Sequence, residues 1–332
     1  MRRVGRQEGA APLASGVALG PAVWLSGYAI LPLAKVYNTD REYEARTLAD
    51  DLSAHLGYGI AASTVFRGPD PGEIMTSTTV PSDMGQQQDL IGQTLVVIGG
   101  SSGIGLETAR LARAHGAEVV LTARDPKRLR DAAEQVGAES TAAFDATDLD
   151  RLEQFFDGLP GPIDHVLVTG SGPYYSTLAD MDFARAGRDV EQRILTTLAV
   201  ARFGAARMRP AGTLLFIGGT GGRSTGAGRT LISAMTAALP PLIANLALEL
   251  APVRANLIAA GFVDTPLSAS LLGDQLDARR AELRATLPIG RVVGPADIAA
   301  LAVHLMTNTA VTGATYDIDG GQQLLSNRGA TR

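Results

Sequence analysis

The chain has 332 residues, 45% of them hydrophobic and 19% charged, which suffices for one core of roughly 250 residues and an additional segment. It holds no cysteine, which excludes disulfide scaffolds, cysteine-bound zinc, iron–sulfur clusters and thiol catalysis, and its 38 glycines follow no tripeptide period, which excludes collagen. The net charge of −5, with acidic and basic residues interspersed, excludes the basic footprint of a nucleic-acid-binding protein, so we expect a small-molecule partner. The lack of cysteine fits a reducing compartment, and we expect a cytoplasmic location.

Residues 1–88 lack a clear alternation of strand and helix patterns, and we predict that they form a poorly structured extension ahead of a domain over 89–332. Within the extension, residues 10–34 are uncharged and follow three arginines, a pattern that also suits a targeting segment or a membrane anchor. Pro12, Pro21 and Pro32 interrupt this stretch and argue against an anchor.

From Gly92 onward, short apolar runs alternate with longer amphipathic segments, which is typical of βα units that feed a mostly parallel sheet. The runs predict seven strands: Thr94–Ile98, Glu118–Thr122, Ser140–Phe144, His165–Thr169, Thr213–Ile217, Arg254–Ala259 and Thr315–Ile318. The segments between them predict helices that include Leu106–Ala114, Pro126–Val136, Ala184–Met208, Leu231–Leu250 and Pro295–Met306. Right-handed crossovers then give an α/β fold: a Rossmann-type, doubly wound, mostly parallel seven-stranded sheet with helices on both faces.

The first strand runs directly into the glycine-rich segment 99–105, and a predicted helix follows. A tight turn after a strand needs glycine torsions, and a pyrophosphate reaches the N–H groups of a helix start only where no side chain blocks its approach. The glycine spacing, G-x3-G-x-G, differs from the commoner G-x-G-x-x-G. Its place between strand and helix nevertheless predicts a dinucleotide site formed by Gly99, Ser101, Ser102, Gly103, Ile104 and Gly105.

The end of the second strand indicates which dinucleotide binds. An NAD site usually places an acidic residue there to hold the ribose 2′-hydroxyl, whereas an arginine suits a 2′-phosphate. Thr122 and Ala123 stand where the acid would be, and Arg124 follows them. The sequence therefore favours NADP(H) over NAD(H).

A second interpretation of this segment stays open, in which Arg124, Lys127 and Arg128 form only a solvated helix start that Asp125 partly neutralises. After the third strand, the dipeptide Asp145-Ala146 is predicted to meet the adenine edge of the cofactor.

These residues resemble the short-chain dehydrogenase/reductase family over about residues 90–321. The family's glycine loop usually reads T-G-x-x-x-G-x-G, which residues 98–105 match with Ile98 in place of the threonine. Residues 260–266 resemble its P-G-x-x-x-T segment with Ala260 in place of proline, and 312–321 resemble its closing strand. The resemblance implies that Thr265 and the backbone near Val263 hold the nicotinamide carboxamide.

The family's reaction uses a tyrosine that exchanges the carbonyl proton, a lysine four residues later, a serine that polarises the oxygen and a supporting asparagine. Aligned on this pattern, the chain has Gly219 at the serine position, Ile232 at the tyrosine, Thr236 at the lysine and Arg193 near the asparagine.

Composition excludes a shifted alignment as the explanation. The chain has no lysine after Lys127 and no tyrosine between Tyr175 and Tyr316, so it contains no Y-x-x-x-K anywhere. The resemblance therefore implies a member with a divergent active site.

One hypothesis keeps hydride transfer and assigns the proton to another group. Tyr174 and Tyr175 follow the fourth strand, at the sheet edge that faces the cofactor in such folds, and the cation of Arg193 would stabilise a phenolate there. The two tyrosines would equally suit a packed loop. Hydrogen bonds to the substrate are expected from Thr220, Ser224 and Ser233. A quinone-like acceptor, whose reduced anion is stable, would need the donor least.

The other hypothesis is an NADP(H)-binding protein without turnover, acting as a redox sensor or an assembly subunit.

The four histidines stand apart in the sequence, so no metal site is predicted. The helices predicted over 184–208 and 231–250 are apolar over much of their surface, and the resemblance implies that their equivalents pair in a homodimer or homotetramer. A buried helix in a monomer would have the same composition.

Overall fold

The computed structural model describes residues 89–170, 172–223 and 225–326, and these contain one sheet of seven parallel strands. The strand order is β3-β2-β1-β4-β5-β6-β7, which confirms the predicted Rossmann-type α/β fold. The strands are β1 (Thr94–Ile98), β2 (Glu118–Ala123), β3 (Ser140–Ala143), β4 (Ile163–Val168), β5 (Met208–Gly219), β6 (Arg254–Ala260) and β7 (Thr315–Ile318). The predictions for residues 1–88, including the uncharged stretch, lie outside the described residues.

Helices follow the strands along the chain. They are α3 (Gly103–Ala114), α4 (Pro126–Val136), α5 (Leu149–Asp157), α6 (Phe183–Val190), α7 (Thr196–Ala205), α8 (Thr230–Glu249), α9 (Pro266–Leu272), α10 (Leu276–Thr286), α11 (Pro295–Thr307) and α12 (Gln322–Ser326). Shorter turns complete the set: the π-helical turn η2 (Glu191–Leu195) and the 3-10 turns η3 (Thr220–Arg223) and η4 (Gly273–Gln275).

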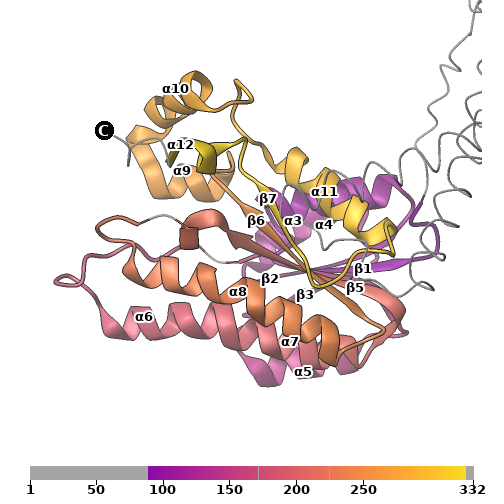
Figure 1. Ribbon diagram of the computed structural model, residues 1–332. Helices are drawn as coiled ribbons and strands as arrows, with labels where there is room; N and C mark the ends of the chain where they lie inside the picture. The colour runs from indigo at the N-terminus through magenta and orange to yellow at the C-terminus, as the bar shows by residue number, and fades with distance from the viewer. Residues whose placement is uncertain (1–88, 171, 224, 327–332) are drawn as a thin grey trace, which may run out of the picture. The chain divides into compact units, whose positions relative to one another are not determined.

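Two hydrophobic cores lie on the two faces of the sheet. Leu95 and Val97 of β1 belong to the core beneath α3, α4 and α11, whereas Val96 and Ile98 belong to the core beneath α5, α7 and α8 (Figure 1). Successive side chains of a strand point to opposite faces, so a strand buried on both faces is apolar throughout. This burial explains the continuous apolar runs that predicted the strands.

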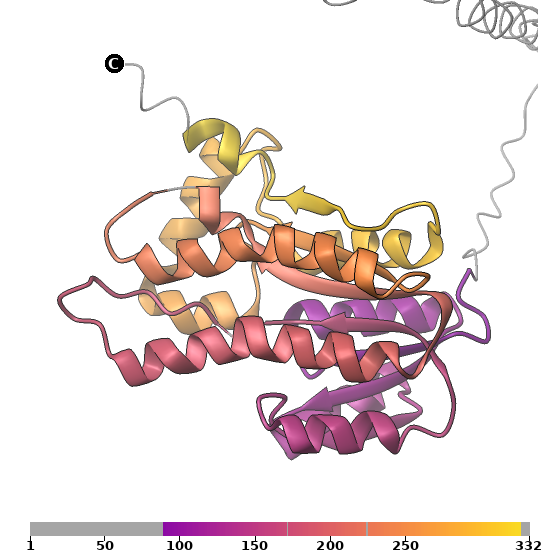
Figure 2. The same cartoon turned by 60° about the horizontal axis from the view of Figure 1, so that its bottom comes forward.

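The helix predicted over 184–208 is present, but its middle is π-helical and it ends earlier than predicted. The π-helical turn η2 lies between α6 and α7, and Figure 2 shows the three segments as one continuous helix. The helix ends at Ala205, and β5 starts at Met208 rather than at the predicted Thr213. Pro210 and the positive φ of Ala211 (64°) lie in this early part of β5, so the apolar run alone did not show where the strand starts.

Among the described residues, α8 alone has the length and hydropathy of a membrane-spanning helix, with a mean hydropathy of 1.7. A core helix passes the same test, and Leu239, Ile243 and Leu246 of α8 are buried on the sheet. Only 33% of its apolar window is buried, and Leu248 is among the side chains that stay exposed.

At the amino-terminal edge of the sheet, one buried arginine ties β6 to the end of α11. Arg254 has no acidic partner among the described residues and donates instead to backbone carbonyls at 2.9–3.2 Å. Removing such a donor would leave several buried acceptors unpaired, which destabilises a fold. The carbonyls belong to Ala211, Leu305, Met306, Asn308 and Val311.

His165, at the same edge, is a buried neutral histidine. Its Nε2 lies 2.6 Å from Oε1 of Gln93, and its Nδ1 is buried without a partner among the described residues. Burial lowers the pKa of His165 from its usual 6.5 to about 4.

This depressed pKa predicts a pH-dependent stability. Because the unfolded chain takes up the proton more readily, the contribution of neutral His165 is complete above pH 6.5 and is lost as the pH falls through about 4. The shift corresponds to roughly 3 kcal/mol. In urea unfolding at a series of pH values, the free energy of unfolding should fall less steeply toward acid pH in His165→Val than in the parent. The control His304→Gln, at an exposed position, should show the same fall as the parent. An unchanged decline in His165→Val would contradict the assignment.

Candidate functional site

The glycine loop lies where β1 and β4 diverge, at the switch point of the sheet. Gly99 has a φ of +92°, and a Cβ on it would lie 2.2 Å from Oγ1 of Thr169. A Cβ on Gly105 would lie 2.3 Å from the carbonyl oxygen of Gly99. Two of the predicted glycines are therefore required by the close approach of β1, β4 and α3.

The glycine loop leads into the start of α3, at the carboxyl ends of β1 and β4 where a cofactor would bind. Ser102 is its N-cap in extended conformation, but no side chain caps the helix and its first turn holds no acidic residue. Uncapped N–H groups at a helix start, behind a loop without side-chain obstruction, suit a pyrophosphate. Gly103, Ile104 and Gly105 form the first turn itself.

Arg124 and Asp145, predicted from separate strands, come together at the ends of β2 and β3. Nη1 of Arg124 lies 3.9 Å from Oδ2 of Asp145, and the Arg124 side chain is 65% exposed. Asp125 instead caps α4, accepting from the N–H groups of Lys127 and Arg128 at 2.9 and 3.0 Å. Asp125 also lies 3.3 Å from Nε of Arg128 and so neutralises part of the basic cluster, as the second interpretation expected, but no salt bridge joins it to Arg124 among the described residues.

On the other side of the crevice, Thr265 is the N-cap of α9 and forms a reciprocal capping box with Ser268. Its Cβ lies 3.5 Å from the position of a Cβ on Gly103, so the glycine loop and Thr265 are neighbours. Asp145-Ala146 and Thr265 lie on opposite sides of the glycine loop in the strand order, as the two ends of a dinucleotide require.

The three positions aligned with the family's serine, tyrosine and lysine also come together. A Cβ on Gly219 would lie 3.5 Å from Cγ2 of Thr236, and the Thr236 hydroxyl donates to the carbonyl of Ile232 at 2.8 Å. Ile232 and Thr236 are both buried, with 4% and 5% exposure. No proton donor points into the crevice from these three side chains.

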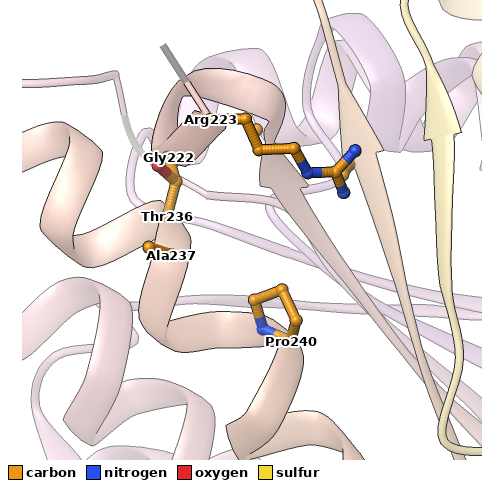
Figure 3. Close-up of a pocket in the computed structure, with 7 residues that line it drawn as sticks. Gly222, Arg223, Thr236, Ala237 and Pro240 are labelled. Carbon is orange, nitrogen blue, oxygen red and sulfur yellow. The ribbon is translucent and has the colours of Figure 1, made fainter. Parts of the chain in front are cut away.

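A pocket of about 170 Å³ lies beside them, between α8 and the ends of β5 and β6. Figure 3 shows Arg223 crossing toward the neighbouring strands while Thr236, Ala237 and Pro240 line the helix side. Gly219 and Thr236 contribute to the lining, so short side chains at the serine and lysine positions leave this space open.

The predicted catalytic tyrosines differ sharply in their surroundings. Tyr174 is 7% exposed, its hydroxyl accepts the N–H of Asp182 at 2.9 Å, and the guanidinium of Arg185 lies 4.5 Å from its ring centre. These contacts make Tyr174 a support for the loop before α6 and argue against it as the acid. Tyr175 is 54% exposed, and its role stays a prediction.

Arg193 does not act as a free cation near a phenol. Its Nε lies 3.2 Å from both carboxylate oxygens of Asp189, and the two side chains are 10% and 5% exposed. The acid neutralises the arginine within η2 and α6, which corrects the predicted electrostatic role. Nη1 of Arg193 nevertheless lies 3.9 Å from the position of a Cβ on Gly170, just beyond β4.

Thr220, the other predicted site residue in this region, lies half-buried at the start of η3.

Sequence reasoning missed a second arginine pair near the pocket. Arg223 forms a two-pronged salt bridge with Asp317 of β7 and donates to Gln323 of α12 at 2.8 Å. The arginine holds the pKa of Asp317 below its usual range. The available signal was Arg223 in the glycine-rich stretch 218–229, but its partners Asp317 and Gln323 lie about a hundred residues away in the sequence.

Comparison with known proteins agrees with this geometry. The family model described as enoyl-(acyl carrier protein) reductase matches residues 98–323, which is more than half of the chain. The chain belongs to the short-chain dehydrogenase/reductase family.

Curated relatives of this short-chain dehydrogenase/reductase include two bacterial enzymes. The 3-oxoacyl-[acyl-carrier-protein] reductase of Salmonella typhimurium is 27% identical over 70% of this chain and 98% of its own length. The cis-4-hydroxycyclohexanecarboxylate dehydrogenase of Sinomonas cyclohexanicum is 34% identical over 68% of this chain and 94% of its own.

Solved structures give the same assignment. BdcA in complex with NADPH matches with a TM-score of 0.63 and 26% identity over 70% of this chain and 95% of its own. The MalC reductase/Diels-Alderase of Malbranchea aurantiaca matches with a TM-score of 0.67 and 25% identity over 72% of this chain and 99% of its own.

The glycine loop of this short-chain dehydrogenase/reductase predicts the effect of one added methyl group. Gly105→Ala forces the α3 start away from Gly99, so NADPH binding should weaken by about tenfold or more in a fluorescence titration. Gly187→Ala, in α6 with nothing within 4 Å of the added Cβ, is the matched control and should bind as the parent does. Equal affinities for the two variants would contradict the packing argument.

Proposed function

We propose that this short-chain dehydrogenase/reductase is an NADP(H)-dependent oxidoreductase. It transfers hydride to or from a small carbonyl, alcohol or quinone-like substrate, with a proton donor other than the family's tyrosine. The single observation that carries the proposal is the intact glycine cradle, which excludes every side chain larger than hydrogen at Gly99 and Gly105. Relatives named as dehydrogenases and reductases, and similar structures solved with NADPH, support it.

The residues present fit the cofactor along its whole length. N–H groups of the glycine loop and the α3 start would hold the pyrophosphate, Arg124 the 2′-phosphate, Asp145-Ala146 the adenine edge, and Thr265 with the backbone near Val263 the carboxamide. When bound, the reduced nicotinamide supplies the hydride. The buried Ile232 excludes water from the position at which the family places its tyrosine.

The typical contributions of acid–base catalysis and of reactant positioning explain how turnover can survive without that tyrosine. General acid–base catalysis contributes about 10²- to 10⁴-fold, roughly 3 to 5 kcal/mol, whereas positioning two reactants contributes about 7 to 11 kcal/mol. The positioning groups are retained in this chain. A quinone-like acceptor, whose reduced anion is stable, depends least on the missing acid. For other substrates, the exposed Tyr175 is the predicted proton donor that remains.

A second candidate function is NADP(H) binding without turnover, as a redox sensor or a subunit of an assembly. It is favoured by the Thr236 hydroxyl, which is buried and bonded to its own helix, and by the absence of a donor at Gly219 and Ile232.

We also propose a homodimer or homotetramer, because α7 and α8 carry apolar side chains that the monomer leaves uncovered. Leu198 is 42% exposed and Leu248 is 79% exposed. The cytoplasmic location stays a prediction.

The choice of cofactor is tested at Arg124. Arg124→Ala removes the charge expected to pair with a 2′-phosphate, so NADPH affinity should fall by about 10- to 100-fold while NADH affinity changes little. Fluorescence titration of both cofactors gives the two affinities, with the exposed Arg130→Ala on α4 as the control. Equal losses for NADPH and NADH would refute the 2′-phosphate role.

Turnover is tested by the absorbance of reduced nicotinamide with quinones, aldehydes and ketones, after binding has been confirmed in the same samples. We expect NADPH consumption with quinones above the rate without enzyme. Tyr175→Phe should lower carbonyl reduction by about 10²-fold or more if Tyr175 is the acid, while Tyr174→Phe, which keeps its packed ring, should retain it. Binding without consumption of any acceptor would favour the non-catalytic function.

A further inference from the structure

Three arginines surround the positions that the family uses for catalysis, and two of them are neutralised. Arg193 pairs with Asp189, and Arg223 pairs with Asp317. Arg229 is different, because no carboxylate among the described residues lies within salt-bridge distance of it and its side chain makes no hydrogen bond to any of them. The first turn of α8 behind it holds no acidic residue.

The guanidinium of Arg229 lies near Gly221 and the Thr236 hydroxyl, beside the position aligned with the family's lysine. Its Nη2 is 3.5 Å from the position of a Cβ on Gly221, and Oγ1 of Thr236 is 3.6 Å from the same position. Arg229 is the N-cap of α8 and precedes Ile232 by three residues, so it stands one turn ahead of the tyrosine position on the same helix. Gly221 itself is two residues past Gly219, the serine position.

The burial of this side chain calls for a partner. Nε of Arg229 is inaccessible to solvent and has no hydrogen-bond partner among the described residues, and Arg229 as a whole is only partly exposed. A buried donor without a partner destabilises a folded protein. An anion that accepts a hydrogen bond from this N–H group would explain why the donor lacks a partner within the described residues.

We propose that Arg229 binds a carboxylate of the substrate. The planar guanidinium fork matches a carboxylate in two parallel hydrogen bonds, whereas the neutral side chains at Gly219, Ile232 and Thr236 offer no charge of their own. An acid anchored at Arg229 would place its uncharged part beside Gly219 and Thr236. The inference rests on the proposed function, since it names the substrate class of the same site.

The test compares benzoate with benzamide, which have nearly the same shape and differ in charge. Affinities are measured by calorimetry with the parent protein, Arg229→Met, Arg229→Lys and, as a matched loss of charge on an exposed helix face, Arg130→Met. NADPH affinity is measured separately by fluorescence for each protein, so that failure of the cofactor site is distinguished from failure of this inference. Circular dichroism checks that each variant is folded.

We expect the parent to bind benzoate at least about tenfold more tightly than benzamide. Arg229→Met should lose that difference and keep its NADPH affinity, Arg229→Lys should retain part of it because the charge remains without the fork, and Arg130→Met should keep all of it. If Arg229→Met does not fold, the comparison of Arg229→Lys with the parent decides.

Three results would overturn the inference. One is equal affinity of the parent for benzoate and benzamide. Another is an unchanged preference in Arg229→Met or, where that variant is unfolded, an undiminished preference in Arg229→Lys. The third is no binding of either compound by folded parent protein. Loss of NADPH binding in the parent would instead count against the proposed function.

Discussion

The contact between the carbonyl of Gly99 and the backbone of Gly105 is the constraint on which the site depends. A Cβ on Gly105 would lie 2.3 Å from that oxygen, so α3 can begin directly against the end of β1 only with glycine there. The Thr169 hydroxyl, which donates to the carbonyls of Ile98 and Gly99 at 3.1 Å, closes the other side of the loop from β4. The position of the helix start and of its uncapped N–H groups, beside the carboxyl ends of β1 and β4, follows from this packing.

Ion pairs then hold the elements around the nicotinamide half of the crevice. Asp189 and Arg193 join α6 to η2, Arg223 and Asp317 join η3 to β7, and Arg280 of α10 donates to both oxygens of Asp264 at 2.8 and 2.9 Å. The Arg223 and Arg280 pairs are partly exposed and contribute little free energy, so their effect is to fix which segments meet rather than to stabilise the fold. The buried pair at Arg193 also removes a charge that the sequence suggested was available.

The catalytic positions combine a retained geometry with altered chemistry. Gly219, Ile232 and Thr236, which the sequence aligns with the family's serine, tyrosine and lysine, lie close together, and none of them offers a proton donor to a substrate. Small side chains at two of the positions leave a pocket of about 170 Å³. A site of this kind can still orient two reactants, because orientation depends on the cradle and the surrounding walls rather than on the acid.

The sequence by itself determined the α/β fold and much of the cofactor crevice. The apolar runs marked the central strands because β1, β4 and β6 are buried on both faces, and the glycine spacing marked the loop because no other residue fits its torsions and contacts. Only the tertiary structure decided which charges are free. Arg193, Arg223 and Arg229 have the same side chain, but Arg193 pairs with Asp189 one helical turn earlier, Arg223 pairs with Asp317 of a distant strand, and no carboxylate among the described residues reaches Arg229. Likewise, Tyr174 and Tyr175 are adjacent in sequence, but opposite side-chain directions bury one and expose the other. Residue type and spacing fix local conformation, whereas pairing and exposure depend on neighbours that only the folded chain supplies.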